Sequence, residues 1–313
     1  MKKIITLFFV LSGLFAFSQQ EAQFTHNMFN QPFYNPASYG VNNMITLTAI
    51  ARQQWLGFKD EEGNNVSPQT FLFSAEAPIK KLKGGIGLSV YKDKLGFEDN
   101  IGVKLGYAFR FNLGPGTFGV GLCVNLLNKS QDFSKLTFTD IYEPLVQNKD
   151  NQSMFLTDIA GGLYYNIPDK MYAGISASQL IQSDQQYSNL ANMQLKRHYY
   201  VTGGYFYEFN NSPFVLNPNL LIKTDFVSAQ YELEALLIYN QKFWGGLGYR
   251  FQDAAMLMLG VSIKGIMIGY SYGFTTSDIR KTSPYGDHEL MLRYAFKVDT
   301  RKVTKSYKNA RYL

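Results

Sequence analysis

Residues able to bind a metal or begin nucleophilic chemistry are few in this 313-residue chain and stand far apart. The three histidines, His26, His198 and His288, are scattered, and no cysteine or carboxylate stands near them at the spacing of metal ligands. Cys123 lies among small residues of an alternating stretch, so we expect its thiol to be inert. No nucleophile has a recognisable base motif around it. We therefore expect a protein that is not an enzyme and that uses no cofactor or metal.

Glycine pairs are the other feature that could serve a ligand, because glycine-rich loops can hold a phosphate. Gly84-Gly85 and Gly245-Gly246 do not precede a helix, as a phosphate loop does. They stand within apolar alternating stretches, where a small residue eases the curvature of a strand. We therefore assign these glycines to strands.

Strict alternation of large apolar residues with small or charged ones is the main structural signal. In Ile101–Asn112, six large apolar side chains alternate with glycine, alanine, lysine, arginine and asparagine. Such alternation places the two kinds of side chain on opposite faces of a strand. The composition agrees, with 22 Tyr, 25 Phe and 27 Gly but only 17% charged residues.

Fourteen segments carry this pattern, and most are close to the ~9–11 residues of a tilted transmembrane strand. An even number is typical of a bacterial single-chain barrel. The segments are 43–52, 69–78, 84–92, 99–111, 117–127, 153–166, 171–178, 195–209, 214–224, 227–239, 242–251, 254–264, 265–275 and 287–297.

Connection lengths support an all-β fold, a transmembrane antiparallel outer-membrane β-barrel of about 14 strands. Every second connection is a short turn, and the longer loops 53–68, 128–152, 179–194 and 276–286 all fall in the other set. Three members of that other set are short, so the rule holds in part. Barrels of this class have short periplasmic turns and longer external loops. We expect the long loops to face outside the cell.

The two ends of the chain differ from the body. Residues 1–18 resemble a signal peptide, with Lys2 and Lys3 before a short apolar stretch and small residues before Gln19. An uncleaved anchor helix is the alternative, but the apolar stretch falls short of the ~20 residues needed to span. Residues 298–313 form a basic periplasmic tail, which accounts for most of the net charge of +6. Nucleic acid is therefore not an expected partner.

The barrel formed by residues 43–297 should turn its apolar face to outer-membrane lipid and a polar face to the lumen. The charges expected inside are either cross-linked or individually solvated. They are Glu76, Asp158, Glu208, Glu232, Glu234, Lys104, Arg110, Lys223, Arg250, Lys264 and Arg293. Residues 19–42 are too aromatic for a disordered tail and too irregular for a strand. We expect them to fold into or against the lumen as a plug, and a periplasmic docking arm is the alternative.

Two further sets of residues are predicted to contact other proteins. Loop aromatics suggest a surface that binds a partner, although they could instead fold down as a lid; they are Trp55, Phe58, Phe133, Phe138 and Tyr142. The last strand ends on an aromatic, as does the signal that assembly machinery reads in outer-membrane barrels. Its residues are Leu290, Leu292, Tyr294 and Phe296, and an ordinary amphipathic strand is the alternative.

Several blocks of sequence resemble the PorP/SprF family. The blocks are Gln23–Asn30, Tyr34–Ala37 with Gly40, Arg52–Phe58, Pro68–Thr70, Tyr91–Gly96 and Gly286–Leu290. Asp287 stands where the family usually has serine. The resemblance runs from residue 23 to the last strand.

This resemblance implies an outer-membrane component of the Bacteroidetes type IX secretion system, linked in some members to gliding motility. Its implied partners are exported cargo proteins with C-terminal sorting domains, such as adhesins, and other secretion components, among them a periplasmic protein. The family implies no catalytic residues. An outer-membrane channel or transporter for small hydrophobic or polar solutes is the alternative function.

Overall fold

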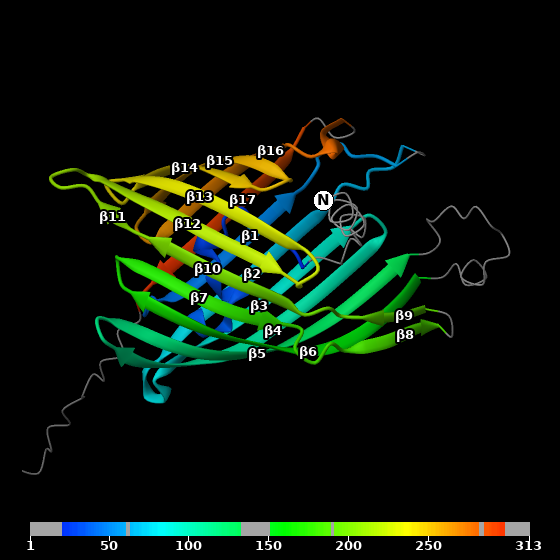
Figure 1. Cartoon of the computed structure of the whole chain (residues 1–313), viewed down its shortest axis with the longest axis horizontal. Coiled ribbons are helices and arrows are strands. Elements are labelled where there is room, and N and C mark those ends of the chain that lie inside the picture. Colours follow the sequence, from blue (N-terminus) through cyan, green and yellow to red (C-terminus); the bar gives the residue numbers. More distant parts are fainter. Residues whose placement is uncertain (1–20, 61–62, 133–150, 189–190, 282–284, 298–313) are drawn as a thin grey trace, which may run out of the picture.

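The structure, a computed structural model, describes residues 21–60, 63–132, 151–188, 191–281 and 285–297. These residues form a closed antiparallel β-barrel of 14 strands (Figure 1). The first and last strands pair from Ile45 opposite Phe296 to Gln53 opposite His288, and this pairing closes the wall. The fold predicted from the sequence is confirmed.

Each wall strand pairs with the strands before and after it in the chain. The first seven are Ile45–Gln53 (β1), Gln69–Ile79 (β2), Gly84–Leu95 (β3), Glu98–Leu113 (β4), Gly116–Asp132 (β5), Asn151–Ile167 (β6) and Met171–Ser178 (β7). The eighth is divided into His198–Tyr205 (β10) and Tyr207–Glu208 (β11), which both pair with the next strand. The remaining six are Phe214–Thr224 (β12), Ala229–Tyr239 (β13), Phe243–Arg250 (β14), Ala254–Ile263 (β15), Ile266–Thr275 (β16) and Asp287–Phe296 (β17).

Shorter elements lie outside the wall. Asp184–Ser188 (β8) and Ala191–Gln194 (β9) form a separate hairpin, where the sequence predicted a plain loop. Three helical turns precede β1, namely Asn27–Phe29 (η1), Gln31–Tyr34 (α2) and Pro36–Ser38 (η2). Two more, Lys80–Leu82 (η3) and Asp278–Lys281 (η6), lie in connections. None of the helices in the described ranges is both long enough and apolar enough to span a bilayer.

Alternation along each strand separates the outside from the inside of the barrel. In β5, Leu122 is 64% exposed whereas the next residue, Cys123, is 3% exposed. The outward set consists of large apolar side chains, as a lipid-facing wall requires. The inward set is largely polar, and its charged members include Glu76, Lys104 and Glu232.

The two ends of the barrel have different connections. At the short-turn end, β15 and β16 are joined by Lys264 and Gly265, which both have positive φ, the geometry of a tight hairpin turn. At the long-loop end, β1 and β2 are joined by residues 54–68 and β16 and β17 by 276–286. Lys264 and Glu208 are exposed near the short-turn end, so the prediction that they face the lumen is wrong.

Candidate functional site

The N-terminal segment, residues 21–42, lies inside the barrel against inward-facing side chains (Figure 1, dark blue). Apolar residues are not regularly spaced along this segment, so it forms only single helical turns. Phe24, His26, Asn35 and Ala37 are nevertheless fully buried. Packing against the surrounding wall therefore fixes this segment where local structure could not.

One anchor of the segment is the carboxylate of Glu289, which points inward from β17. Its Oε2 accepts a hydrogen bond from the backbone N–H of Thr25, and its Oε1 accepts one from the N–H of His26, both at 2.8 Å. Nδ1 of His26 lies 2.7 Å from the same Oε1. One carboxylate thus satisfies two backbone donors that have no partner in secondary structure.

A second anchor joins two adjacent inward carboxylates of β13 to amide side chains of the segment. Glu232 accepts hydrogen bonds from Gln23 Nε2 at 2.7 Å and Asn27 Nδ2 at 2.8 Å. The same Asn27 amide donates to Glu234 at 3.1 Å. Arg250, fully buried on β14, donates to Glu232 at 2.6 Å. The positive guanidinium of Arg250 compensates the negative charge of Glu232, which the neutral amides of Gln23 and Asn27 cannot do.

Glu21, at the start of the described segment, is surrounded by donors from three strands. Lys104 of β4 lies 2.9 Å from its carboxylate and the Tyr200 hydroxyl of β10 lies 2.5 Å away. Lys223 of β12 donates to its backbone carbonyl at 2.6 Å. Burial alone would raise the pKa of Glu21, but the charge and hydrogen bond of Lys104, with that of Tyr200, outweigh burial and lower the pKa to about 2.

The later part of the segment is held by close packing against glycines of the wall. A Cβ atom on Gly87 or Gly106 would lie closer than 3.0 Å to the ring of Tyr39. A Cβ on Gly119 or Gly121 would meet the backbone of Ala37 equally closely. We call these glycines, with Gly85, Gly162 and Gly174, which approach Tyr39 and Asn35, the glycine cradle. Any larger residue there would displace the segment.

The segment crosses the lumen from one end of the barrel to the other. Gly40 donates its N–H to Glu76 at 2.8 Å and accepts from Arg110 at 2.6 Å, both near the short-turn end. Glu21 meets Ser178, the last residue of β7, at the long-loop end. The lumen is therefore occupied along its length by this chain's own residues.

The long-loop end carries an open hollow of about 390 Å³ beside the first loop. Trp55 and Phe58 line it, with ring centroids 6.2 Å apart, together with Val66 and Pro68 of the same loop. Leu95 and Phe97 close it from the β3–β4 connection. The structure thus brings together two of the residues predicted to bind a partner.

Comparison with known families places this chain among type IX secretion system membrane proteins. Residues 16–294 match the family described as "Type IX secretion system membrane protein PorP/SprF". This chain belongs to the PorP/SprF family. It is an outer-membrane β-barrel of the type IX secretion system, and the resemblance seen in the sequence is confirmed. No curated protein matches the chain.

Solved outer-membrane barrels share the general fold with this PorP/SprF protein. Omp33 of Acinetobacter baumannii is 8% identical, with a TM-score of 0.45, over 82% of this chain and 99% of its own. The toluene transporter TodX of P. putida is 9% identical, with a TM-score of 0.45, over 86% and 94%. The translocator domain of NalP from Neisseria meningitidis is 10% identical, with a TM-score of 0.38, over 87% and 96%. None of these likenesses bears on function.

The charges predicted to line the lumen of this family member are arranged in neither of the two ways expected. Among the described ranges, only Glu232 and Arg250 of that predicted set form a direct ion pair with each other. Lys104, Glu76 and Arg110 bind the N-terminal segment instead. The sequence did not reveal these pairs, because each joins residues far apart along the chain.

The remaining predicted site residues are placed only in part. Leu290, Leu292 and Tyr294 face outward from β17, and the ring of Phe296 stacks on Tyr294 at 5.0 Å. Phe133, Phe138 and Tyr142 lie outside the described residues, as do the signal peptide 1–18 and the tail 298–313. Cys123 is buried next to Tyr39. No group of three potential metal ligands occurs within the described ranges.

Proposed function

We propose that this barrel supports the secretion or cell-surface attachment of exported cargo with C-terminal sorting domains, such as the adhesins used in gliding motility. In this proposal the cargo docks at the long-loop end and does not pass through the lumen. The proposal extends the family assignment, which places the chain in the type IX secretion system.

Occupation of the lumen by residues 21–42 is the observation that carries this proposal. A conduit for protein would need an open lumen, whereas here Glu289, Glu232 and Lys104 bind the segment by direct hydrogen bonds. Release would leave several buried charges without their partners, a cost of roughly 1–3 kcal/mol for each group that stays buried and unsatisfied. The occupied lumen therefore favours a docking platform over a channel.

The aromatic hollow at the long-loop end is the proposed docking surface. Trp55 and Phe58 are half-buried and border open space, which is the condition under which an aromatic can anchor a partner. Phe133, Phe138 and Tyr142, which lie outside the described residues, are predicted to bind the same partner. The occupant we propose is the sorting domain of the cargo.

Co-purification from the native host tests the docking surface. The Trp55→Ala, Phe138→Ala, Tyr142→Ala variant should lose sorting-domain cargo, measured by mass spectrometry, while the barrel remains at normal level. A matched control removes three exposed aromatics at the short-turn end, as Tyr207→Ala, Phe209→Ala, Phe214→Ala, and should keep the cargo. Unchanged cargo in the first variant would remove these loops from the mechanism.

A solute channel is the second candidate, and the polar inward face of the wall is the observation that favours it. The two functions predict different behaviour in a planar bilayer. A docking platform with an occupied lumen should show no open-channel current, whereas steady conductance of the unmodified protein would favour the channel.

The proposal also assigns the two ends of the chain. We expect cleavage between Ser18 and Gln19, and a basic tail, 298–313, in the periplasm, where it would meet a periplasmic secretion component. The N-terminal sequence of the mature protein tests the first point. Deletion of 298–313, followed by measurement of which secretion components co-purify, tests the second.

A further inference from the structure

A shallow groove runs along the outer face of β1, where the barrel wall meets lipid. The outward residues of this strand include two successive alanines, Ala49 and Ala51. The register sets Ala49 between Leu292 and Phe73. It likewise sets Ala51 between the outward residues at positions 290 and 71 of the same two neighbouring strands. Two small side chains thus lie between two rows of tall ones.

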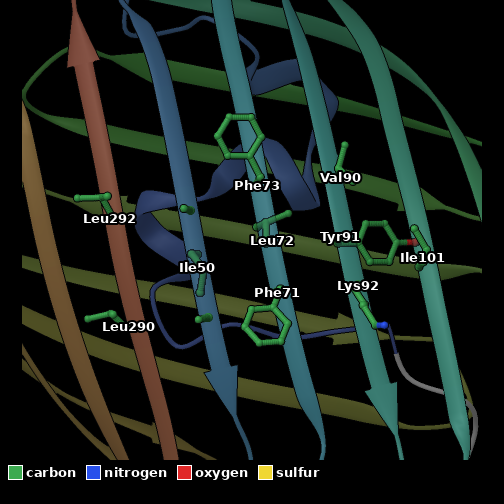
Figure 2. Close-up of a pocket in the computed structure, with 12 residues that line it drawn as sticks. Ile50, Phe71, Leu72, Phe73, Val90, Tyr91, Lys92, Ile101, Leu290 and Leu292 are labelled. Atoms are coloured by element: carbon green, nitrogen blue, oxygen red, sulfur yellow. The ribbon is translucent and has the colours of Figure 1, made fainter.

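The groove is a measurable hollow and not merely a sequence pattern. It encloses about 380 Å³, and the side chains around it are almost all apolar. Figure 2 shows Phe71 and Phe73 on one side and Leu290 and Leu292 on the other, with only short side chains of β1 between them. A continuous lipid-facing wall would instead carry large residues on each strand, as β5 does.

The dimensions of the groove restrict what can occupy it. Strands β17 and β2 flank β1 and are therefore separated by about 10 Å between axes, because neighbouring strands lie ~4.8 Å apart. A helix with its side chains is about 10–12 Å wide and cannot descend between the two rows. An added strand is excluded too, because β1 already pairs along both edges. A single extended hydrocarbon chain fits these limits.

Charge at one end of the groove indicates the headgroup of such a chain. Lys92 lines the hollow at its long-loop end, as Figure 2 shows, and Lys94 lies two residues further along the same face. Asp99 forms an ion pair with Lys92 at 2.8 Å, and both side chains are about half exposed. Two lysines beside one aspartate leave this rim positive, which attracts anionic headgroups.

We propose that this groove binds one acyl chain of an anionic phospholipid, with its negatively charged headgroup at Lys92 and Lys94. The chain lies over Ala49 and Ala51 and fills the hollow between the two rows. This site is on the outer wall, separate from the occupied lumen. Its headgroup end lies beside Leu95 of the aromatic hollow, but its acyl chain lies over β1, which does not line that hollow. The site therefore goes beyond the docking function and does not depend on it.

Photocrosslinking in vesicles tests the site. The full barrel is reconstituted in phosphatidylcholine containing a small fraction of phosphatidylglycerol with a diazirine on one acyl chain, and adducts are mapped by mass spectrometry. Adducts on β17, β1 and β2 should exceed the mean of the other outward-facing strands severalfold. The Ala49→Leu, Ala51→Leu variant, which fills the groove, should bring them down to that mean.

Matched variants separate the groove from general effects on the wall. Ala173→Leu, Ala235→Leu makes the same change at outward positions of β7 and β13 and should leave the excess intact. Lys92→Gln, Lys94→Gln should reduce labelling by phosphatidylglycerol while sparing labelling by a phosphatidylcholine probe. Adducts spread evenly around the unmodified barrel would overturn the proposal. This outcome is measured on the unmodified protein and does not require the filled variant to fold.

Discussion

Glu289 accepts hydrogen bonds from Thr25 and His26, two consecutive residues of the N-terminal segment, and so replaces the backbone partners that a strand or helix would supply. Glu232 accepts hydrogen bonds from the side-chain amides of Gln23 and Asn27. Inside a barrel, a charge must find partners or remain hydrated, because its desolvation is costly. At the scale of single residues, the inward charges of this wall bind the N-terminal segment.

Acid should weaken the hold on the start of the segment. The pKa of Glu21 is lowered from 4.5 to about 2, so its contribution to stability is complete above pH 4.5 and is lost as the pH falls towards 2. A spin label on Ala22→Cys, in a Cys123→Ser background, should therefore become more mobile across that range. Electron paramagnetic resonance spectra of the folded barrel measure this change.

The matched control for the acid experiment is Glu21→Gln carrying the same label. Because this variant lacks the carboxylate, its label should already be mobile at neutral pH and should change little with acid. A spectrum of the unmodified protein that stays rigid down to pH 2 would show that the Lys104–Glu21 pair does not hold this end.

The sequence could not predict which side chains of the site bind each other. His26 seemed isolated because its partner, Glu289, is 263 residues away and belongs to the last strand. Cys123, placed by the sequence among the small residues of an alternating stretch, faces inward, whereas its neighbours Leu122 and Val124 face outward. Orientation follows from local alternation, whereas pairing across the lumen depends on the closed wall.

At the scale of elements, alternation predicted every wall strand, because a lipid-facing strand must be apolar on one side only. The strands of the wall differ from the predicted ranges mainly at the long-loop end. There β5 continues to Asp132 and β6 begins at Asn151, pairing through polar residues that give no alternating signal. The β8–β9 hairpin was missed for the same reason.

The glycine cradle makes a prediction about a single strand position. Gly121→Ala would place a methyl group closer than 3.0 Å to the backbone of Ala37. Overpacking of this kind destabilises the folded structure by about 1–3 kcal/mol. We expect the barrel to form and the segment to loosen. Chymotrypsin should then cleave the folded protein after Phe24, Phe29 or Phe33, while heat-modifiable migration on gels remains.

Gly203→Ala is the control for this prediction, because only one atom lies within 4 Å of the position its Cβ would take, at 3.7 Å. It adds the same methyl group to the wall, on the outward face of β10, and should leave the segment protected. Equal protection of both variants would mean that close approach at Gly121 is not required for the segment to bind.

The last strand makes a second prediction at this scale. If the alternating residues up to Phe296 form the assembly signal, Phe296→Asp should prevent insertion and abolish heat-modifiable migration. Charge on the lipid face costs ~2–4 kcal/mol at the midplane for Arg or Lys, and less for Asp or near an interface, so membrane energetics alone would be tolerated. Phe243→Asp, at the same end of β14, is the control and should insert. Normal insertion of Phe296→Asp would exclude the signal.

At the scale of the whole molecule, the difference between the two barrel ends predicts its orientation. Asn64 is exposed at the long-loop end and Asn211 is exposed at the short-turn end. With long loops outside, Asn64→Cys should react with an impermeant maleimide on intact cells. Asn211→Cys should react only after the cells are broken. The reverse pattern would place the long loops in the periplasm.

Barrel closure and family were both predictable from the sequence, because the even strand count and the PorP/SprF blocks are properties of the chain itself. The location of residues 21–42 was less so: the sequence favoured a plug in the lumen but left a periplasmic docking arm as the alternative. No periodicity marks the segment as buried, since its partners are a ring of strands and not one apolar face. Their inward glycines were attributed to curvature, although several of them leave room for Tyr39, Ala37 and Asn35.

Because the barrel encloses the N-terminal segment of the same chain, this segment can be fixed only after the whole wall has been synthesised. Thr25 bonds to Glu289 across a separation of 264 residues, almost the whole length of the described chain. Contacts of such long range form late, since the entropy of closing the intervening loop must be overcome first. Nascent protein that lacks β17 therefore cannot hold Thr25 and His26 in place. If the predicted signal peptide directs export, we expect residues 21–42 to be among the first to enter the periplasm and among the last to become fixed, with chaperones shielding their aromatic side chains until then.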